Sequence, residues 1–251
     1  MNRRLARALT AIAAVAALLL GAPGPVPADP DTTPPLVTLD RGIHSPLGAV
    51  LTNASADPHY PGTLSWTTSD PSGICLQTLT LSHQDPRTGV WQYEQPALGP
   101  ASRRARISFQ VAAPTYTIAL TVTDCAGNVA DLGTNIYPTL TQQTAGTRTA
   151  GWSTSRCSCW SGGSVLRSSN KGASWSTEFY GSISLISDRR PTRGTAKVYI
   201  DGVFSATVNL AGPRRNLVTV FQQQFTTGSL LHTLKVVVSK GRFDVDAVVT
   251  S

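Results

Sequence analysis

Two stretches near the C-terminus decide the fold class. Gly194–Leu210 reads GTAKVYIDGVFSATVNL, and His232–Val249 reads HTLKVVVSKGRFDVDAVV. Apolar residues alternate there with small or polar ones, a period of two that is typical of half-buried strands. Asp201-Gly202 separates two such runs and predicts a two-residue hairpin. The alternation passes through Ala196, Val198, Ile200, Val203, Ser205, Thr207 and Asn209.

The composition of the chain extends this prediction to the whole protein. Helix-favouring residues are few, with two Glu, four Lys and one Met, and a composition rich in Thr, Ser, Val, Gly and Pro favours strands and turns. The length suits two domains of roughly 100 residues each. We therefore predict an all-β protein of two antiparallel β-sandwich domains.

Residues 1–28 have the three parts of a secretory signal peptide. Arg3, Arg4 and Arg7 form a basic head, an apolar run covers Leu9–Leu20, and the small residues of Val26–Ala28 suit cleavage. The run is too short to cross an apolar layer of ~30 Å, which argues against a membrane anchor. No later stretch approaches the roughly 18 apolar residues of a membrane span. We therefore expect an exported, cleaved protein without a membrane span, either secreted or held to a cell surface by binding. Arg outnumbers Lys 17 to 4, which suggests a GC-rich, actinobacterium-like source.

The charge of +7 is unevenly distributed. Asp29–Gln143 has 5 basic and 9 acidic residues, whereas Thr144–Ser251 has 13 basic and 5 acidic residues, a net charge of +8. This suggests an acidic partner for the second half, such as an anionic polymer. A charge of about this size is also ordinary solubility charge for a small domain.

Residues 31–138 contain a series of short strand patterns separated by turn signals, which suggests a sandwich. The opening Thr32–Pro35, the Ser-Asp-Pro-Ser-Gly-Ile turn at Ser69–Ile74 and the Asp-Cys-Ala-Gly-Asn motif at Asp124–Asn128 resemble the immunoglobulin-like repeats of secreted bacterial proteins. The resemblance implies a spacing, display or adhesive module. In such sandwiches the loops that hold Cys75 and Cys125 lie at the same end, so the resemblance also implies a Cys75–Cys125 disulfide. Trp66 is expected in the core.

Thr139–Gly151 has no apolar period and is predicted to be a polar linker. Residues 152–251 contain Gly172–Trp175, Arg193-Gly194 and Leu231–Lys235 in an order that resembles the galactose-binding-like jelly rolls of carbohydrate-binding modules. The resemblance implies a jelly roll whose members bind sugars, lipids or proteins, or only pack against a neighbouring domain, so the fold does not settle the function.

Aromatic and basic residues of this second module are the candidate ligand-binding residues. Trp160, Trp152 and Tyr180 are candidate platforms for sugar rings, with Trp160 preferred because it lies in a Gly-rich loop. Trp175 shares a strand face with Phe179 and is expected in the core. Arg189, Arg190 and Arg193 form a basic loop that is either a phosphate, sulfate or carboxylate site or a plain solvated loop.

Cysteine and carboxylate pairs complete the candidates. Cys157 and Cys159 are expected to form a local disulfide and not half of a zinc site, because the chain has no second ligand pair for zinc; pairing with the cysteines of the first module is the alternative. Asp244 and Asp246 flank one residue and share a strand face, which fits either a calcium site or a solvated face.

Motifs of common enzyme classes are missing from the sequence, including G-x-S-x-G, H-E-x-x-H and the P-loop. The chain has only two glutamates, Glu94 and Glu178, and no carboxylate pair stands out for sugar hydrolysis. We therefore expect a non-catalytic, monomeric binding protein without a cofactor, whose partner is a polysaccharide or cell-envelope glycan. The alternative is a structural or adhesive spacer that contacts proteins.

Overall fold

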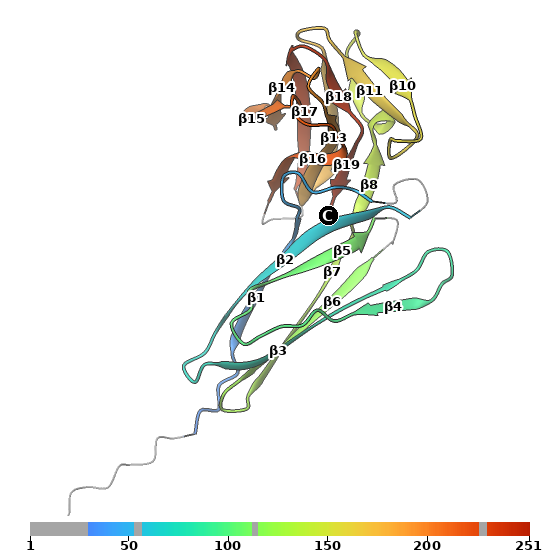
Figure 1. Cartoon of the computed structure of the whole chain (residues 1–251). Helices are drawn as coiled ribbons and strands as arrows, with labels where there is room; N and C mark the ends of the chain where they lie inside the picture. The colour runs from blue at the N-terminus through green and yellow to red at the C-terminus, as the bar shows by residue number, and fades with distance from the viewer. Residues whose placement is uncertain (1–29, 53–56, 112–114, 226–229) are drawn as a thin grey trace, which may run out of the picture. The chain divides into compact units, whose positions relative to one another are not determined.

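The structure is a computed structural model that describes residues 30–52, 57–111, 115–225 and 230–251. The predicted signal peptide at residues 1–28 lies outside these ranges. In the described ranges every regular element is a β-strand except the 3₁₀ turn η1 (Gln143–Ala145), and no helix is long and apolar enough to cross a membrane (Figure 1). The all-β fold class is confirmed, and Thr32–Ser251 forms one compact unit.

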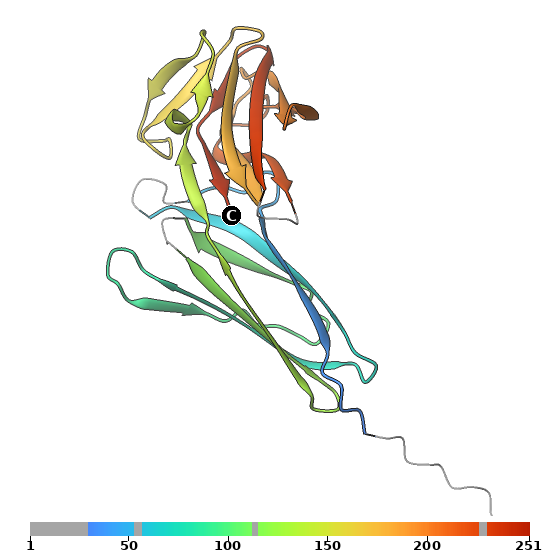
Figure 2. The same cartoon turned by 180° about the vertical axis from the view of Figure 1, so that it is seen from behind.

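The first sandwich consists of two antiparallel sheets (Figure 2). One contains β1 (Leu36–His44), β2 (His59–Ser69) and β5 (Arg104–Gln110), in that order. The other has the order β4 (Trp91–Glu94), β3 (Ile74–Gln84), β6 (Tyr116–Asp124) and β7 (Val129–Ile136). Alternate side chains point inward and bury a shared core, as a period of two requires.

Trp66 lies in this core, as predicted, and organises a polar contact inside it. Its indole N–H donates to the side-chain oxygen of Gln77 at 2.7 Å. The Gln77 amide in turn donates to three backbone carbonyls between Gly99 and Ser102. Because a buried polar group needs a partner, this network fixes the segment between β4 and β5 to the core.

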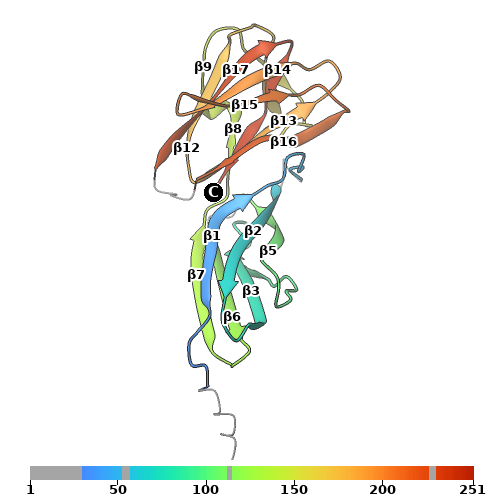
Figure 3. The ribbon, with the colours of Figure 1, turned by 90° about the vertical axis from the view of Figure 1, so that its left-hand side faces the viewer.

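The second sandwich pairs a five-stranded sheet with a four-stranded one (Figure 3). The five-stranded sheet has the order β15 (Val203–Asn209), β14 (Thr195–Ile200), β17 (Leu231–Lys240), β12 (Ser174–Tyr180) and β9 (Thr147–Arg148). The four-stranded sheet has the order β16 (Arg215–Gln224), β13 (Ser182–Arg189), β19 (Ala247–Thr250) and β8 (Thr139–Gln142). A small sheet of β10 (Ser153–Arg156), β11 (Ser164–Ser168) and β18 (Phe243–Val245) completes it.

The predicted Asp201-Gly202 hairpin is confirmed. Ile200 pairs with Val203 across the turn, and Asp201 and Gly202 have φ values of 51° and 80°, as an Asp-Gly turn of this length requires. The alternation beyond the turn was predicted wrongly, because the register shifts from Tyr199↔Phe204 to Val198↔Ala206 and leaves Ser205 as an extra residue. This bulge turns Ala206 and Val208 toward the core, opposite Val198 and Ala196, in place of the predicted Ser205 and Thr207.

Residues 139–151 differ from the expected linker, because they contribute two strands to the second sandwich. Thr139–Gln142 pairs with β19, and Thr147-Arg148 pairs with β12. Between them the carbonyl of Gln143 accepts a hydrogen bond from the buried Trp175 indole at 2.9 Å. A stretch with no apolar period is thus held by backbone pairing and by one core tryptophan.

Both predicted disulfides are present, Cys75–Cys125 and Cys157–Cys159. The first joins the start of β3 to the turn that follows β6, and the second lies within the turn between β10 and β11. No cysteine is left free among the described residues.

A third hydrophobic cluster contains residues of both sandwiches. Leu51, Tyr60 and Val111 pack with Ile186, Ala247 and Val249 of the four-stranded sheet. Backbone hydrogen bonds accompany this packing, from Gly48 N–H to the Thr219 carbonyl at 2.8 Å and from Leu51 N–H to the Leu217 carbonyl at 2.9 Å. The outer side of the four-stranded sheet is therefore partly covered by the chain itself.

Replacement of Gly146 by alanine is expected to destabilise the protein. A Cβ atom there would lie 2.5 Å from Trp175 ring atoms, although the backbone conformation itself (φ −81°, ψ 160°) suits any residue. We expect Gly146→Ala to lower the free energy of unfolding by about 1–3 kcal/mol through overpacking. Gly99→Ala is the control, because its Cβ would meet nothing within 4 Å. Denaturant midpoints measure both, and equal midpoints would contradict the prediction.

Candidate functional site

Trp160, the preferred sugar platform, is only 3% exposed, so this prediction was wrong. The turn folds back on itself, with the Trp160 N–H donating to the Cys157 carbonyl and the Gly163 N–H donating to the Trp160 carbonyl. The next residue, Ser161, donates from its backbone and its hydroxyl to the Asp246 carboxylate at 3.2–3.3 Å. These anchors draw the loop onto the sandwich and bury the ring.

The other two predicted rings have different environments. Trp152 is half-buried against the core of the second sandwich, and its indole N–H donates to the Ser174 carbonyl at 3.0 Å. Tyr180, at the end of β12, is 55% exposed. Of the three candidates only Tyr180 presents its ring to a ligand.

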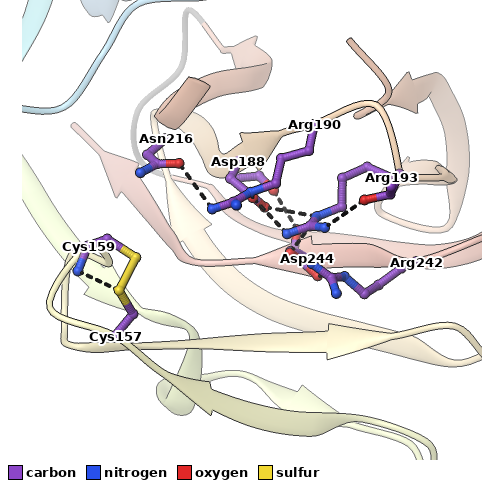
Figure 4. A network of polar contacts seen from close by, with 10 residues as sticks. Cys157, Cys159, Asp188, Arg190, Arg193, Asn216, Arg242 and Asp244 are labelled. Carbon is purple, nitrogen blue, oxygen red and sulfur yellow. Dashed lines mark hydrogen bonds and ion pairs between the residues drawn. A yellow bond between two sulfur atoms is a disulfide. The ribbon is translucent and has the colours of Figure 1, made fainter. Parts of the chain in front are cut away.

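The basic loop is not an open anion site, which corrects the second group of candidates (Figure 4). Arg193 is buried, with Nη2 placed 2.8 Å from Asp188 Oδ2 and Nε placed 2.8 Å from Asp244 Oδ2. Arg190 donates from Nε to Asp188 Oδ2 at 2.6 Å, and Arg189 donates to a backbone carbonyl at 3.1 Å. The guanidinium groups therefore serve internal partners, because buried carboxylates require nearby positive charge.

The two carboxyl groups of this cluster titrate differently. Burial raises the pKa of Asp244 to about 6, and the neighbouring Asp188 carboxylate adds to the effect. The pKa of Asp188 lies below its usual value. Burial acts to raise it, but hydrogen bonds from Asp244, Arg190 and Arg193 outweigh the effect of burial. Asp244 lies within ion-pair distance of Arg193 and of Arg242, at 2.8 and 3.3 Å, but without aligned hydrogen bonds to them.

Asp246 is fully buried, and burial raises its pKa to about 7. Its hydrogen bonds from Ser161 oppose that rise. Asp244 and Asp246 are therefore not on a solvated face. Asp244 lies beside arginine side chains, whereas Asp246 accepts hydrogen bonds from Ser161. Calcium binding by these carboxylates stays a prediction.

The outer side of the five-stranded sheet carries exposed rings beside charged groups, and we call this surface the five-stranded face. Tyr199 and Phe204 pair across β14 and β15, with ring centroids 5.9 Å apart in an edge-to-face arrangement. Phe204 is 53% exposed, although neighbouring Val198 and Ile200 are buried in the core. On the strand that flanks β14 opposite β15, Lys235 of β17 is the register partner of Tyr199.

A shallow depression of about 390 Å³ lies along β9, β12 and β17. On its floor the hydroxyl groups of Thr147 and Ser176 are hydrogen-bonded at 2.8 Å. Ser176 also pairs in register with Lys235, which places the depression beside the aromatic pair on the same face. The lining residues are Ala145, Thr147, Ser176, Thr177, Glu178 and Thr233.

The sequence-based search missed Tyr199 and Phe204 for an identifiable reason. Tyr199 alternates with the buried Val198 and Ile200, so the period of two already placed it on the solvent side with Lys197. Phe204 follows from the predicted hairpin, because a two-residue turn pairs Ile200 with Val203 and therefore Tyr199 with Phe204, ahead of the bulge at Ser205. The hairpin alone therefore brings the two rings together, and they were missed because the candidate rings were chosen in other strands and loops.

No family model and no curated protein matches the sequence. Among solved structures, the CBM36-1 domain of a multidomain xylanase from the hindgut metagenome of Trinervitermes trinervoides is similar, with 17% identity over 45% of this chain and 94% of that chain and a TM-score of 0.31. A carbohydrate-binding module of the β-sandwich superfamily matches 87% of this chain and 98% of its own length, at 12% identity and a TM-score of 0.27.

The exo-β-1,3-galactanase of Phanerochaete chrysosporium covers 87% of this chain and 68% of its own length, at 10% identity and a TM-score of 0.37. Identities and TM-scores this low carry no argument about function, which rests on the side chains described above.

Removal of Arg193 is expected to be strongly destabilising. Arg193→Ala would leave the buried Asp188 and Asp244 without their shared guanidinium, and breaking a buried ion pair in this way costs about 3–5 kcal/mol. Arg214→Ala is the control, because Arg214 is exposed and a surface change is expected to stay within about 0.5 kcal/mol. Thermal unfolding at neutral pH distinguishes them, and two similar midpoints would contradict the role of Arg193.

Asp246 is expected to make stability fall as pH rises. Because the pKa of Asp246 is about 7 in the folded protein against its ordinary value of 3.8, folding favours the protonated form, and its contribution is complete below pH ~4 and lost as pH rises through 7. Asp246→Asn cannot ionise, so it should gain on the order of 3 kcal/mol relative to wild type between acid and alkaline pH. Unfolding midpoints from pH 5 to 8.5 measure this, and parallel pH profiles for the two proteins would refute it.

Proposed function

We propose that this chain is a secreted, non-catalytic protein that binds a polysaccharide or a cell-envelope glycan through the five-stranded face. The observation that carries the proposal is the edge-to-face pair of the half-buried Tyr199 and the exposed Phe204, beside Lys235 and the polar depression. Exposed rings in contact with each other on a strand face are a surface on which a ligand can stack.

The chemistry of this face suits a sugar. A pyranose ring has one apolar face that stacks on an aromatic ring, and hydroxyl groups at its edge that seek polar partners. Glu178 and Thr233 are register partners at the depression and offer a carboxylate and a hydroxyl. A volume of about 390 Å³ falls in the range of about 300–1,000 Å³ for small-molecule sites, although this site is shallow.

A non-catalytic role agrees with where the perturbed carboxyl groups lie. Asp188, Asp244 and Asp246 have shifted pKa values, and perturbed groups often mark catalytic sites. All three are fully buried and contact arginine or serine side chains, so a polysaccharide has no access to them. Their arrangement supports a structural role instead.

Loss of the aromatic pair is expected to weaken glycan binding. The double variant Tyr199→Ala/Phe204→Ala removes both stacking rings, and we expect its affinity for a neutral polysaccharide to fall roughly tenfold or more, the cost of losing a central aromatic anchor. The measurement is a depletion isotherm of the full mature chain on insoluble cellulose, chitin and xylan. Val203→Ala is the control, because it removes an exposed apolar side chain from the same strand.

The salt dependence of binding distinguishes this proposal from its alternatives. Stacking and hydrogen bonding should change little at about 1 M salt, where screening confines charge interactions to about 3 Å. Binding that disappears at high salt and is unaffected by the double variant would show an anionic polymer as the partner, consistent with the +8 charge of Thr144–Ser251. Full retention of binding by the double variant at both salt levels would refute the five-stranded face as the site.

A further inference from the structure

A second pair of exposed rings lies on the first sandwich. Trp91 is 53% exposed and Tyr93 is 71% exposed, both on the edge strand β4 (Figure 1). Residues two apart on a strand project from the same side, with a spacing of roughly 7 Å. Their register partners on β3 are Gln84 and Ser82, which alternate with the buried Leu81. The two rings therefore stand on the outer side of the sheet, away from its core.

The hairpin that carries Trp91 is held by its own hydrogen bonds. The Gln84 amide donates to the Gly89 carbonyl at 2.8 Å, and Asp85 N–H donates to the Val90 carbonyl at 2.9 Å. The Asp85 carboxylate accepts the backbone N–H of Arg87 at 2.8 Å. These bonds lower the conformational freedom of the turn, so the rings are presented in a preorganised position at little further entropic cost to a ligand.

The sheet surface beside the rings consists mostly of short side chains, many of which carry hydroxyl groups. Its outer positions pair across β3, β6 and β7 and carry mostly small side chains, with the larger amides of Gln84 beside Trp91 and Asn135 beside Thr117. Some of these groups are already oriented, since the Gln95 amide donates to the Thr80 hydroxyl at 3.0 Å. The outer residues of this floor are Ser82, Thr80, Thr78, Thr117, Ala119, Thr121 and Gly133.

The charge of this surface selects the class of ligand. The outer positions of β3, β4, β6 and β7, all within the described chain, include no lysine or arginine. They include one carboxylate, Asp131, which accepts a hydrogen bond from Thr121 at 2.6 Å. Apart from Arg87 in the β3–β4 turn, a polyanion finds no positive charge at these strand positions, whereas an uncharged chain of hydroxyl groups is matched in charge and in hydrogen-bonding capacity.

We propose that the outer side of the β4-β3-β6-β7 sheet is a second glycan site, which takes a neutral polysaccharide chain. Trp91 and Tyr93 stack on successive or neighbouring pyranose rings, and the threonine and serine hydroxyls of the floor bond the sugar hydroxyls. The site uses no residue of the five-stranded face and is independent of it.

The test uses the full mature chain and the variant Trp91→Ala/Tyr93→Ala. Depletion isotherms are recorded on insoluble cellulose, chitin and mannan, at low and high salt, in the wild-type background and in the Tyr199→Ala/Phe204→Ala background. We expect the residual binding in that second background to fall by on the order of tenfold when Trp91 and Tyr93 are removed. Gln92→Ala/Glu94→Ala is the control, because these side chains lie on the same exposed strand and project from its other side.

Each outcome decides between explanations. A loss caused by Trp91→Ala/Tyr93→Ala alone, with the control unaffected and little salt dependence, supports the second site whether or not the five-stranded face binds. Equal binding by Trp91→Ala/Tyr93→Ala and by its control Gln92→Ala/Glu94→Ala overturns the second site. No retention of the wild-type chain on any of the three polysaccharides overturns it as well. Concentration-dependent self-association that disappears in the Trp91 variant would show instead that the rings contact protein.

Discussion

The ion pairs of Arg193 with Asp188 and Asp244 are the constraint on which the second sandwich depends. Asp188 lies near the end of β13, Arg193 comes from the loop that follows it, and Asp244 lies in β18, so one guanidinium joins the β13–β14 region to a strand far along the chain. Because a buried charge is tolerated only when it is paired, each of these segments must take its position for the others to be stable. The raised pKa of Asp244 shows that this compensation is incomplete.

This cluster also decides where a ligand can bind. It takes up Arg190 and Arg193 of the basic loop at Arg189–Arg193, so the positive charge there stabilises the fold. The turn with Cys157 and Cys159 is similarly occupied, because Ser161 bonds to Asp246 and buries Trp160. Accessible rings remain on the outer sides of sheets, where strand alternation forces every second side chain away from the core.

The two aromatic faces differ in a way that suggests different tasks. The five-stranded face combines Tyr199 and Phe204 with lysine and glutamate side chains, whereas the face at Trp91 and Tyr93 is nearly uncharged. The first suits a ligand that needs charge-assisted hydrogen bonds, and the second suits a plain neutral chain. Two sites on one chain would raise the avidity for a long polymer without any new contact at either site.

The sequence by itself determined the features that depend on local order. These are the all-β class, the Asp201-Gly202 hairpin and the inward position of Trp66 and Trp175, since alternation and turn chemistry act over a few residues. The disulfide of Cys75 with Cys125 followed from a family resemblance. Only the tertiary structure decided that residues 139–151 join two sheets and that Trp160 is buried. Each of these depends on a partner from a distant part of the chain, which no local pattern of residues specifies.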